Sequence, residues 1–248
     1  MPFLDLADRV REVRERIDAA ARRGGHGGDG GAGGRGGGRG TQQVTVVAVT
    51  KTHGPDALQA AWDAGLKDVG ENRVQEALDK MAVLPPALSF RWHLIGHLQR
   101  NKVKHLTRFH VLHSLDRASL ADAVNAYGGS VSRVFDVFVQ VNVVGETTKG
   151  GYDVATFAPE AARLRKMESL RVRGVMTMAP YDADEKLLRS VFQGARNARD
   201  LLRAEGHADA TELSMGMSND YEIAVEEGAT CVRLGTVLFG PRDMKEPA

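Results

Sequence analysis

Residues 44–70, VTVVAVTKTHGPDALQAAWDAGLKDVG, begin the strand–helix alternation that the rest of the chain continues. The apolar run Val44–Val49 is typical of a buried β-strand, and Gly54-Pro55 then opens a helical pattern that extends to residue 64. The short apolar run Leu66–Val69 predicts the next strand. A strand, a helix and another strand in this order predict two parallel strands joined by a helical crossover.

The alternation continues toward the end of the chain. Further strands are predicted at residues 90–95, 109–113, 134–141, 170–176, 212–213 and 230–234. Helical patterns are predicted at 72–82, 98–106, 116–127, 155–166, 185–204 and 219–227, with VLFGPR, 237–242, as a short closing helix. Eight strand–helix steps within about 200 residues predict a (β/α)8 TIM barrel. The alternative is a doubly wound open sheet, which would usually have fewer strands and a phosphate-binding glycine motif after the first strand; that motif is missing here.

The segment before the first strand divides into two parts. Residues 3–22 form an amphipathic helical pattern, and residues 24–40 contain 12 glycines in 17 positions. Such a glycine-rich stretch cannot bury enough apolar surface to offset its ordering entropy. We therefore expect an amino-terminal helix (1–23) that packs on the barrel, a flexible linker (24–43) and the barrel itself (44–248). The two arginines among the glycines are a weak signal for RNA, and we expect no nucleic-acid partner.

The composition excludes several classes of protein. The chain has 248 residues, 42% of them hydrophobic and 26% charged, with a formal net charge of +1, so no global field favours nucleic acid or an acidic membrane. The single cysteine, Cys231, allows no intrachain disulfide and fits a reducing compartment. No apolar run approaches the roughly 20 residues of a membrane span, and the amino terminus lacks a signal peptide. We expect a cytoplasmic protein, and the histidine spacing predicts no metal site.

The loops after the last two predicted strands indicate an anion site. In this fold, functional groups gather at the carboxyl ends of the strands, and phosphate usually binds after strands 7 and 8. Gly216 and Gly235 allow close approach of the backbone to a ligand, and Ser218 and Thr236 carry hydroxyl donors. Each motif alone is more typical of a helix cap or a turn, but together they predict a phosphate site.

Lys51 ends the first strand, opposite this predicted phosphate site. A lysine at the mouth of a partly apolar barrel has its charged form disfavoured by desolvation, which exposes the amine for Schiff-base chemistry. A lysine that only extends to solvent is the alternative. A reactive amine opposite a phosphate site predicts an aldehyde cofactor that carries a phosphate, pyridoxal 5′-phosphate (PLP).

The ordered motifs resemble one known family. AVTKT, GENRVQEALDK, WHLIGHLQRNKVK, HSLDR, RGVMTMAP, LSMGMSNDYEIAVEEGATCVRLGT and FGPR are similar to those of the pyridoxal phosphate homeostasis protein family, across residues 44–242. That family is similar in fold to the barrel domain of alanine racemase, so the resemblance implies an α/β fold, a (β/α)8 barrel of the alanine racemase amino-terminal type with an extra amino-terminal helix. The glycine-rich run at 24–40 departs from the family pattern, and we expect it to leave binding intact.

The resemblance also implies residue roles. Lys51 matches the lysine that forms the internal aldimine with PLP, and Arg233 matches the arginine that faces the pyridine nitrogen. Ser218, Gly235 and Thr236, with backbone amides near Met217, match the phosphate site, and the others are expected to line the pocket. The predicted cofactor-binding residues are Lys51, Asn72, His93, Met176, Met217, Ser218, Arg233, Gly235 and Thr236.

The resemblance implies a binding protein rather than an enzyme. Members of the family bind PLP and maintain vitamin B6 balance without robust catalysis, which makes PLP-dependent apoenzymes the candidate partners. A permanent cation at the pyridine nitrogen opposes its protonation and weakens the ring as an electron sink. Alanine racemase takes a second base from a further β-domain of its partner subunit. This chain ends about ten residues after the last predicted strand, so we expect no such domain and a monomer. A racemase-like enzyme and a Schiff-base aldolase are the alternatives.

Overall fold

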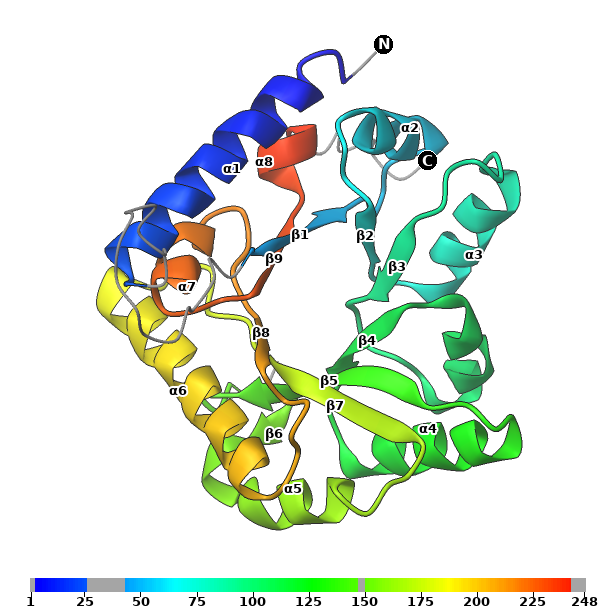
Figure 1. The fold of residues 1–248 in the computed structure, drawn as a ribbon, viewed down its shortest axis with the longest axis vertical. Helices are drawn as coiled ribbons and strands as arrows, with labels where there is room; N and C mark the ends of the chain where they lie inside the picture. Colours follow the sequence, from blue (N-terminus) through cyan, green and yellow to red (C-terminus); the bar gives the residue numbers. More distant parts are fainter. Residues whose placement is uncertain (1–2, 26–42, 147–149, 242–248) are drawn as a thin grey trace, which may run out of the picture.

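The computed structural model describes residues 3–25, 43–146 and 150–241, and its centre is a ring of strands (Figure 1). The ring strands are β1 (Thr45–Val49), β2 (Asp68–Glu71), β3 (Arg91–Leu94), β4 (Val111–Leu115), β5 (Phe135–Asn142), β7 (Leu170–Met176), β8 (Glu212–Ser214) and β9 (Cys231–Leu234). Neighbours pair in this order, and both β9 with β1 and β4 with β5 pair as well, so the ring is closed. Every pairing is parallel. The predicted barrel is confirmed, and the open sheet is excluded.

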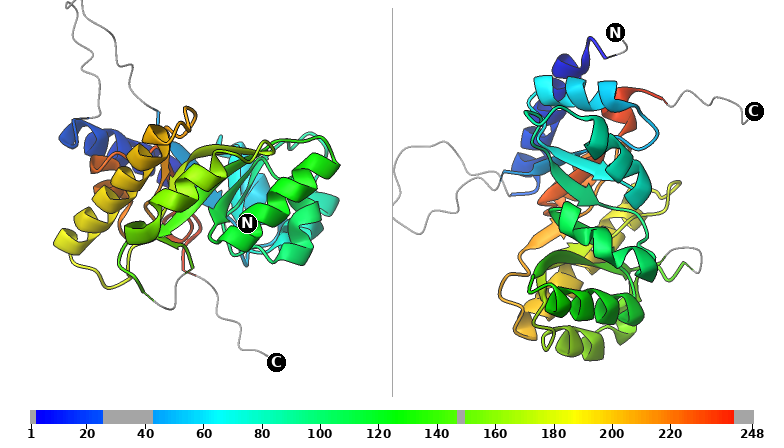
Figure 2. Two further views of the ribbon diagram at one scale, coloured as in Figure 1. Left: turned by 90° about the horizontal axis from the view of Figure 1, so that it is seen from below. Right: turned by 90° about the vertical axis from the view of Figure 1, so that its right-hand side faces the viewer.

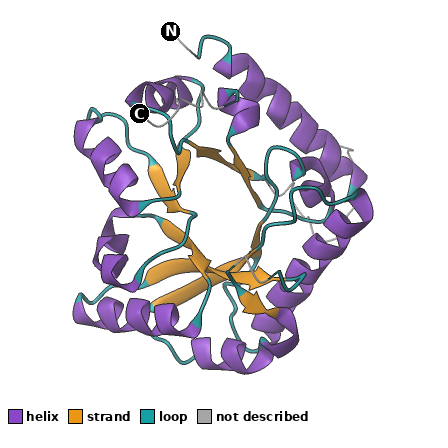
Figure 3. Ribbon diagram, turned by 180° about the vertical axis from the view of Figure 1, so that it is seen from behind, coloured by secondary structure: helices purple, strands orange, loops and turns teal. Residues whose placement is uncertain are grey.

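Helices surround the ring on its outer side (Figures 2 and 3). The helices are α1 (Leu6–Arg23), α2 (Pro55–Asp63), α3 (Val74–Val83), η1 (Arg100–Arg108), α4 (Ala118–Ser130), η2 (Val154–Thr156), α5 (Ala158–Leu164), α6 (Glu185–Ala204), α7 (Tyr221–Glu226) and α8 (Thr236–Phe239). Pro55 occupies the first turn of α2, where a missing N–H costs nothing. The turn at Gly54-Pro55 therefore starts the first crossover, as its sequence predicts.

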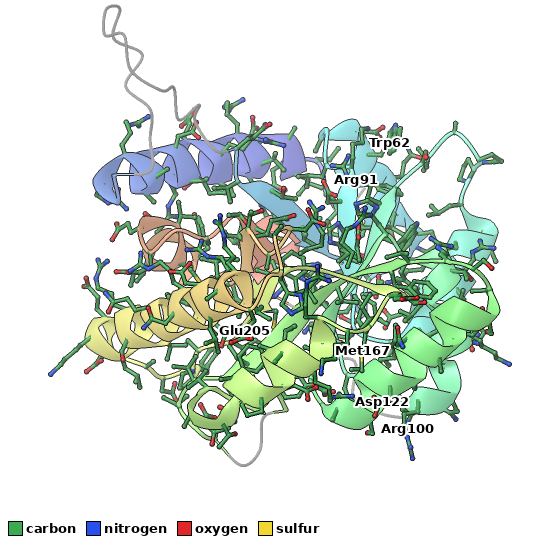
Figure 4. All side chains as sticks on the ribbon, turned by 60° about the horizontal axis from the view of Figure 1, so that its bottom comes forward. Trp62, Arg91, Arg100, Asp122, Met167 and Glu205 are labelled. Carbon is green, nitrogen blue, oxygen red and sulfur yellow. The ribbon has the colours of Figure 1, made fainter. Side chains whose placement is uncertain are left out.

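Strand residues alternate between two apolar environments. In β1, Val46 and Ala48 belong to the large core between the barrel and its helices, whereas Val47 and Val49 are buried outside that cluster. Inside the ring, Val111, Phe138 and Met176 form a separate apolar cluster. Figure 4 shows the side chains that occupy the space between the ribbons. Because both faces of each strand are buried, the strands appear in the sequence as continuous apolar runs.

Helix α1 packs against the outside of the barrel beside α7 and α8. Its buried residues recur every three or four positions; they are Leu6, Val10, Val13, Ile17 and Ala20. The predicted amphipathic helix is thus present. Residues 26–42, which hold most of the predicted glycine-rich linker, lie outside the described residues.

The type of element differs from the sequence prediction in two places, apart from shifts of element boundaries. The segment predicted as a helix at 98–106 is the 3₁₀ helix η1, whose buried Val103 and Leu106 are three residues apart, the repeat of a 3₁₀ turn. The two-residue strand β6 (Tyr152–Asp153) pairs with the end of β5 and has no counterpart in the prediction. It is too short to give a periodic signal.

Candidate functional site

A cavity of about 580 Å³ lies at the carboxyl ends of the barrel strands. Residues that directly follow strands line it: Lys51 near the end of β1, Asn72 after β2, Asp116 after β4 and Gly235 after β9. Gln140, near the end of β5, lines it as well. The cavity therefore occupies the place where this fold collects functional side chains.

Seven of the nine residues predicted from the sequence line this one cavity. They are Lys51, Asn72, Met217, Ser218, Arg233, Gly235 and Thr236. They come from loops after β1, β2, β8 and β9 and from β9 itself, and the closed ring brings them together. The structure thus brings these seven residues together, and their roles toward a ligand are predictions.

The other two predicted residues lie outside the cavity lining. Met176 is fully buried inside the ring with Val111 and Phe138, and its neighbour along the strand end, Met178, reaches the cavity instead. His93 is buried in the barrel interior, where its ring nitrogens face Asp68 and His113. Their expected place in the pocket wall is therefore corrected to the barrel interior.

Asp116 is a cavity residue that the sequence prediction missed. Its carboxylate contacts His97 Nδ1 at 2.7 Å and accepts a hydrogen bond from Arg117. His97 and Asp116 both line the cavity. The fourth strand was predicted to end at residue 113, but β4 continues to Leu115. Asp116 is therefore the first residue after the strand, and a correct strand end was the signal that would have identified it.

The backbone on both sides of Lys51 is held by a charged group, the Lys80 cluster (Lys80, Glu71 and Glu76), in which Lys80 and Glu71 are buried and Glu76 is partly exposed. Lys80 Nζ donates to the Thr50 carbonyl at 2.8 Å, to Glu71 Oε1 at 2.7 Å and to Glu76 Oε1 at 2.9 Å. Thr50 Oγ1 donates to Glu71 at 2.6 Å, and the Thr52 N–H donates to Glu76 at 2.6 Å. The cluster thus fixes the residue before Lys51 and the residue after it.

Two further features show how constrained this segment is. Thr52 has a φ of 70°, in the left-handed region that β-branched residues avoid. Glu71 is fully buried, and its Oε2 has no hydrogen-bond partner among the residues that the structure describes. Desolvation raises the pKa of Glu71, although hydrogen bonds from Lys80 and Thr50 act in the opposite direction. At Glu76, desolvation also acts to raise the pKa, but the hydrogen bonds from Lys80 and Thr52 outweigh it, and the pKa is lowered. Strain of this kind persists only where the surroundings enforce it.

The loops after β8 and β9 are joined through their backbones. The Arg233 N–H donates to the Gly216 carbonyl at 2.9 Å, and the Val237 N–H donates to Ser218 Oγ at 3.3 Å. Gly216 has a φ of +95°, and a Cβ there would lie 2.8 Å from Ala224 Cβ, so no larger residue fits. Ser218 and Thr236, on these joined loops, both line the same cavity.

Arg233 is a buried cation at the cavity with only neutral hydrogen-bond partners among the described residues. Its side chain donates to Ser214 Oγ at 2.7 Å and to the Thr177 carbonyl at 2.9 Å, and it forms no ion pair within the part of the chain that the structure describes. Desolvation lowers its pKa, opposed by the charges of Cys231 and Asp220. A guanidinium in this position has unused donors for an acceptor in the cavity.

The fold and this cavity define a (β/α)8 barrel of the alanine racemase amino-terminal type. The family model described as alanine racemase, N-terminal domain, matches residues 39–243. The pyridoxal phosphate homeostasis protein of Aquifex aeolicus is 39% identical over 240 residues, 96% of this chain and 99% of that protein. The protein of that name from Escherichia coli K12 is 34% identical over 96% of this chain and 97% of its own length.

A solved structure agrees with these relatives. PipY of Synechococcus elongatus PCC7942, described with PLP bound, is 32% identical and superposes with a TM-score of 0.79, covering 95% of this chain and 100% of PipY. This chain belongs to the pyridoxal phosphate homeostasis protein family. Within residues 3–25, 43–146 and 150–241, no helix has the length and apolar character that a membrane span needs.

Proposed function

We propose that this protein binds PLP in the cavity, held covalently through Lys51, and serves intracellular PLP homeostasis without robust catalysis. The observation that carries the proposal is that one cavity is lined by an amine, a buried guanidinium and two hydroxyls, from Lys51, Arg233, Ser218 and Thr236. Relatives named for PLP homeostasis and a related structure described with PLP bound support it.

The donor set fits the three functional ends of PLP. The amine of Lys51 is the group that condenses with an aldehyde. Ser218 and Thr236, on loops after adjacent strands, offer hydroxyl donors to a phosphate, and Gly216 and Gly235 keep the backbone close to it. Arg233 offers N–H donors to the ring nitrogen, which is an acceptor when unprotonated. When bound, PLP supplies an electrophilic carbon and an aromatic ring that withdraws electrons.

The residues around the cavity favour retention of the cofactor over turnover. Arg233 is held in place by Ser214 and Thr177, and a cation beside the ring nitrogen opposes its protonation, so the ring withdraws electrons less strongly. Tyr181 is the one tyrosine among the described lining residues, and its side chain is 82% exposed, so few protein contacts hold it in position as an acid–base group. We therefore propose slow side activity at most, and no racemase function.

The first experiment is an absorbance spectrum from about 300 to 500 nm after addition of PLP, followed by borohydride reduction and mass mapping of the modified lysine. We expect a band near the visible edge that reduction fixes onto Lys51. Lys51→Ala should lose the band, because Lys51 is the one lysine among the described residues that line the cavity. Lys104→Ala, an exposed lysine of η1, is the control and should keep it.

The absence of any band after addition of PLP would contradict the proposal. A phosphorylated sugar that borohydride traps on Lys51 would then favour the Schiff-base aldolase. Turnover of L-alanine to D-alanine near one per second would contradict the non-catalytic part alone. PLP-dependent apoenzymes, as receivers of the bound cofactor, are part of the same proposal.

A further inference from the structure

A continuous line of buried polar side chains crosses the barrel interior to Arg233. Asp68 Oδ1 lies 3.0 Å from His93 Nε2, and His93 Nδ1 lies 2.8 Å from His113 Nε2. His113 Nδ1 lies 2.7 Å from Ser214 Oγ, which accepts from Arg233 at 2.7 Å. All five side chains are buried. These residues, the Asp68–Arg233 relay, come from β2, β3, β4, β8 and β9.

The chemistry of the two ends favours one direction for every hydrogen bond. A guanidinium has donors and no acceptor, so Ser214 Oγ accepts from Arg233, and its O–H is available to donate to His113 Nδ1. A neutral His113 then carries its proton on Nε2 and donates to His93 Nδ1. A neutral His93 likewise carries its proton on Nε2 and donates to Asp68. The carboxylate of Asp68 can only accept, so the opposite end demands the same order.

The surroundings of His113 favour a neutral ring. Desolvation in the barrel interior is the main cause that lowers the pKa of His113 well below its usual value. The ring of His110 lies 5.9 Å from that of His93, and desolvation lowers the pKa of His110 as well. At the outer end, Arg91, labelled in Figure 4, forms an ion pair with Asp68.

The aligned bonds serve the buried charge of Arg233. Each member of the relay turns a lone pair toward the guanidinium and an N–H or O–H toward the carboxylate of Asp68. In an interior of low dielectric, dipoles aligned between a cation and an anion stabilise both. The relay thus connects Arg233, which has no carboxylate partner among the described residues, to an anion on the far side of the barrel interior.

We propose that Asp68, His93, His113 and Ser214 are positioning residues that orient Arg233 and keep it charged through a one-directional hydrogen-bond relay. Arg233 Nη1 is then fixed toward Ser214, which leaves the remaining guanidinium donors to the cavity. The effect on the ring nitrogen of the cofactor rests on the proposed function, whereas the relay itself does not.

The direct test is ¹⁵N NMR of histidine side chains in the protein without cofactor at neutral pH. We expect both His93 and His113 as neutral rings with the proton on Nε2. A proton on Nδ1 of His113, or a doubly protonated His93, would overturn the relay. This measurement is independent of PLP, so a failure of the proposed function leaves it interpretable.

The functional test adds PLP to Ser214→Ala. Loss of the hydroxyl removes the acceptor of Arg233 and the donor to His113, so we expect mixed His113 tautomers. We also expect a shifted pH midpoint of the cofactor band and roughly tenfold weaker PLP binding. Ser214→Thr keeps the hydroxyl and should restore the pH midpoint of the band. Ser114→Ala, an equally buried serine that donates to the Gly96 carbonyl instead, should leave the His113 tautomer unchanged. An unchanged pH midpoint in Ser214→Ala would reject the positioning role.

Discussion

Two buried cations lie near the cavity, and their partners differ in kind. Lys80 is 6% exposed and is held by two carboxylates, Glu71 and Glu76. Arg233 is 5% exposed, and within the described part of the chain it donates only to neutral oxygens of Ser214 and Thr177. The charge of a cation paired with carboxylates is already compensated within the protein. A cation with neutral partners is not compensated in this way, and its remaining N–H donors can bind an anionic or lone-pair acceptor of a ligand. Lys80 therefore holds the backbone around Lys51, and the neutral partners of Arg233 support its proposed contact with the ligand.

The largest effect is expected from breaking the Lys80 cluster. Lys80→Met leaves Glu71 buried without its main partner, and we expect a loss of about 3–5 kcal/mol in the free energy of unfolding, measured by urea titration. Adding Glu71→Gln to this variant should recover part of the loss, because it removes the unpaired carboxylate.

Lys67→Met is the matched control for this test. Lys67 lies over the ring of Trp62 and donates to its carbonyl, so its removal should cost about 1 kcal/mol or less. If Lys80→Met lowered the free energy of unfolding no more than this control does, the structural role of Lys80 would be rejected.

The acid end of the Asp68–Arg233 relay predicts a smaller, pH-dependent effect. Desolvation raises the pKa of Asp68, but hydrogen bonds from His93 and Arg91 outweigh it and lower the pKa from 3.8 to about 2. A carboxyl with a lowered pKa contributes stability that is fully present above its unfolded pKa and is lost as pH falls through the folded value. We therefore expect Asp68 to contribute about 2 kcal/mol near neutral pH, lost between about pH 4 and 2.

Urea titrations of the wild type and Asp68→Asn from pH 6 to pH 3 test this expectation. The two proteins should differ most at pH 6 and converge as the pH falls. A difference that stays constant over this range would show that the Asp68 carboxylate is not what the relay stabilises.

Features set by a single strand and the residues that follow it can be predicted from the sequence. Side-chain contacts set by the register between strands cannot. Eight apolar runs suffice for the barrel, and the rule that functional groups follow strands places Lys51 and Arg233 at one cavity. The contact between His113 and Ser214 joins residues 101 positions apart and exists only because the ring closes. The position of His93 on its strand predicted a place in the pocket wall. Its side chain instead lies in the barrel interior, where it contacts Asp68 and His113.

The smallest effect is expected at Thr52, whose left-handed backbone lies between Lys51 and the Lys80 cluster. Thr52→Gly relieves the steric cost of φ 70° but adds backbone entropy to the unfolded chain, so we expect a net gain of only about 0.5–1 kcal/mol. The freed backbone should nevertheless hold Lys51 less firmly and release PLP a few-fold faster.

Ser132→Gly is the matched control, because Ser132 is the other described residue besides glycine with a positive φ, 51°, and it follows α4 away from the cavity lining. Both variants should gain stability, and only Thr52→Gly should lose cofactor faster. Equal release rates would mean that the strain at Thr52 plays no part in positioning Lys51, and that the hydrogen bonds of the Lys80 cluster suffice.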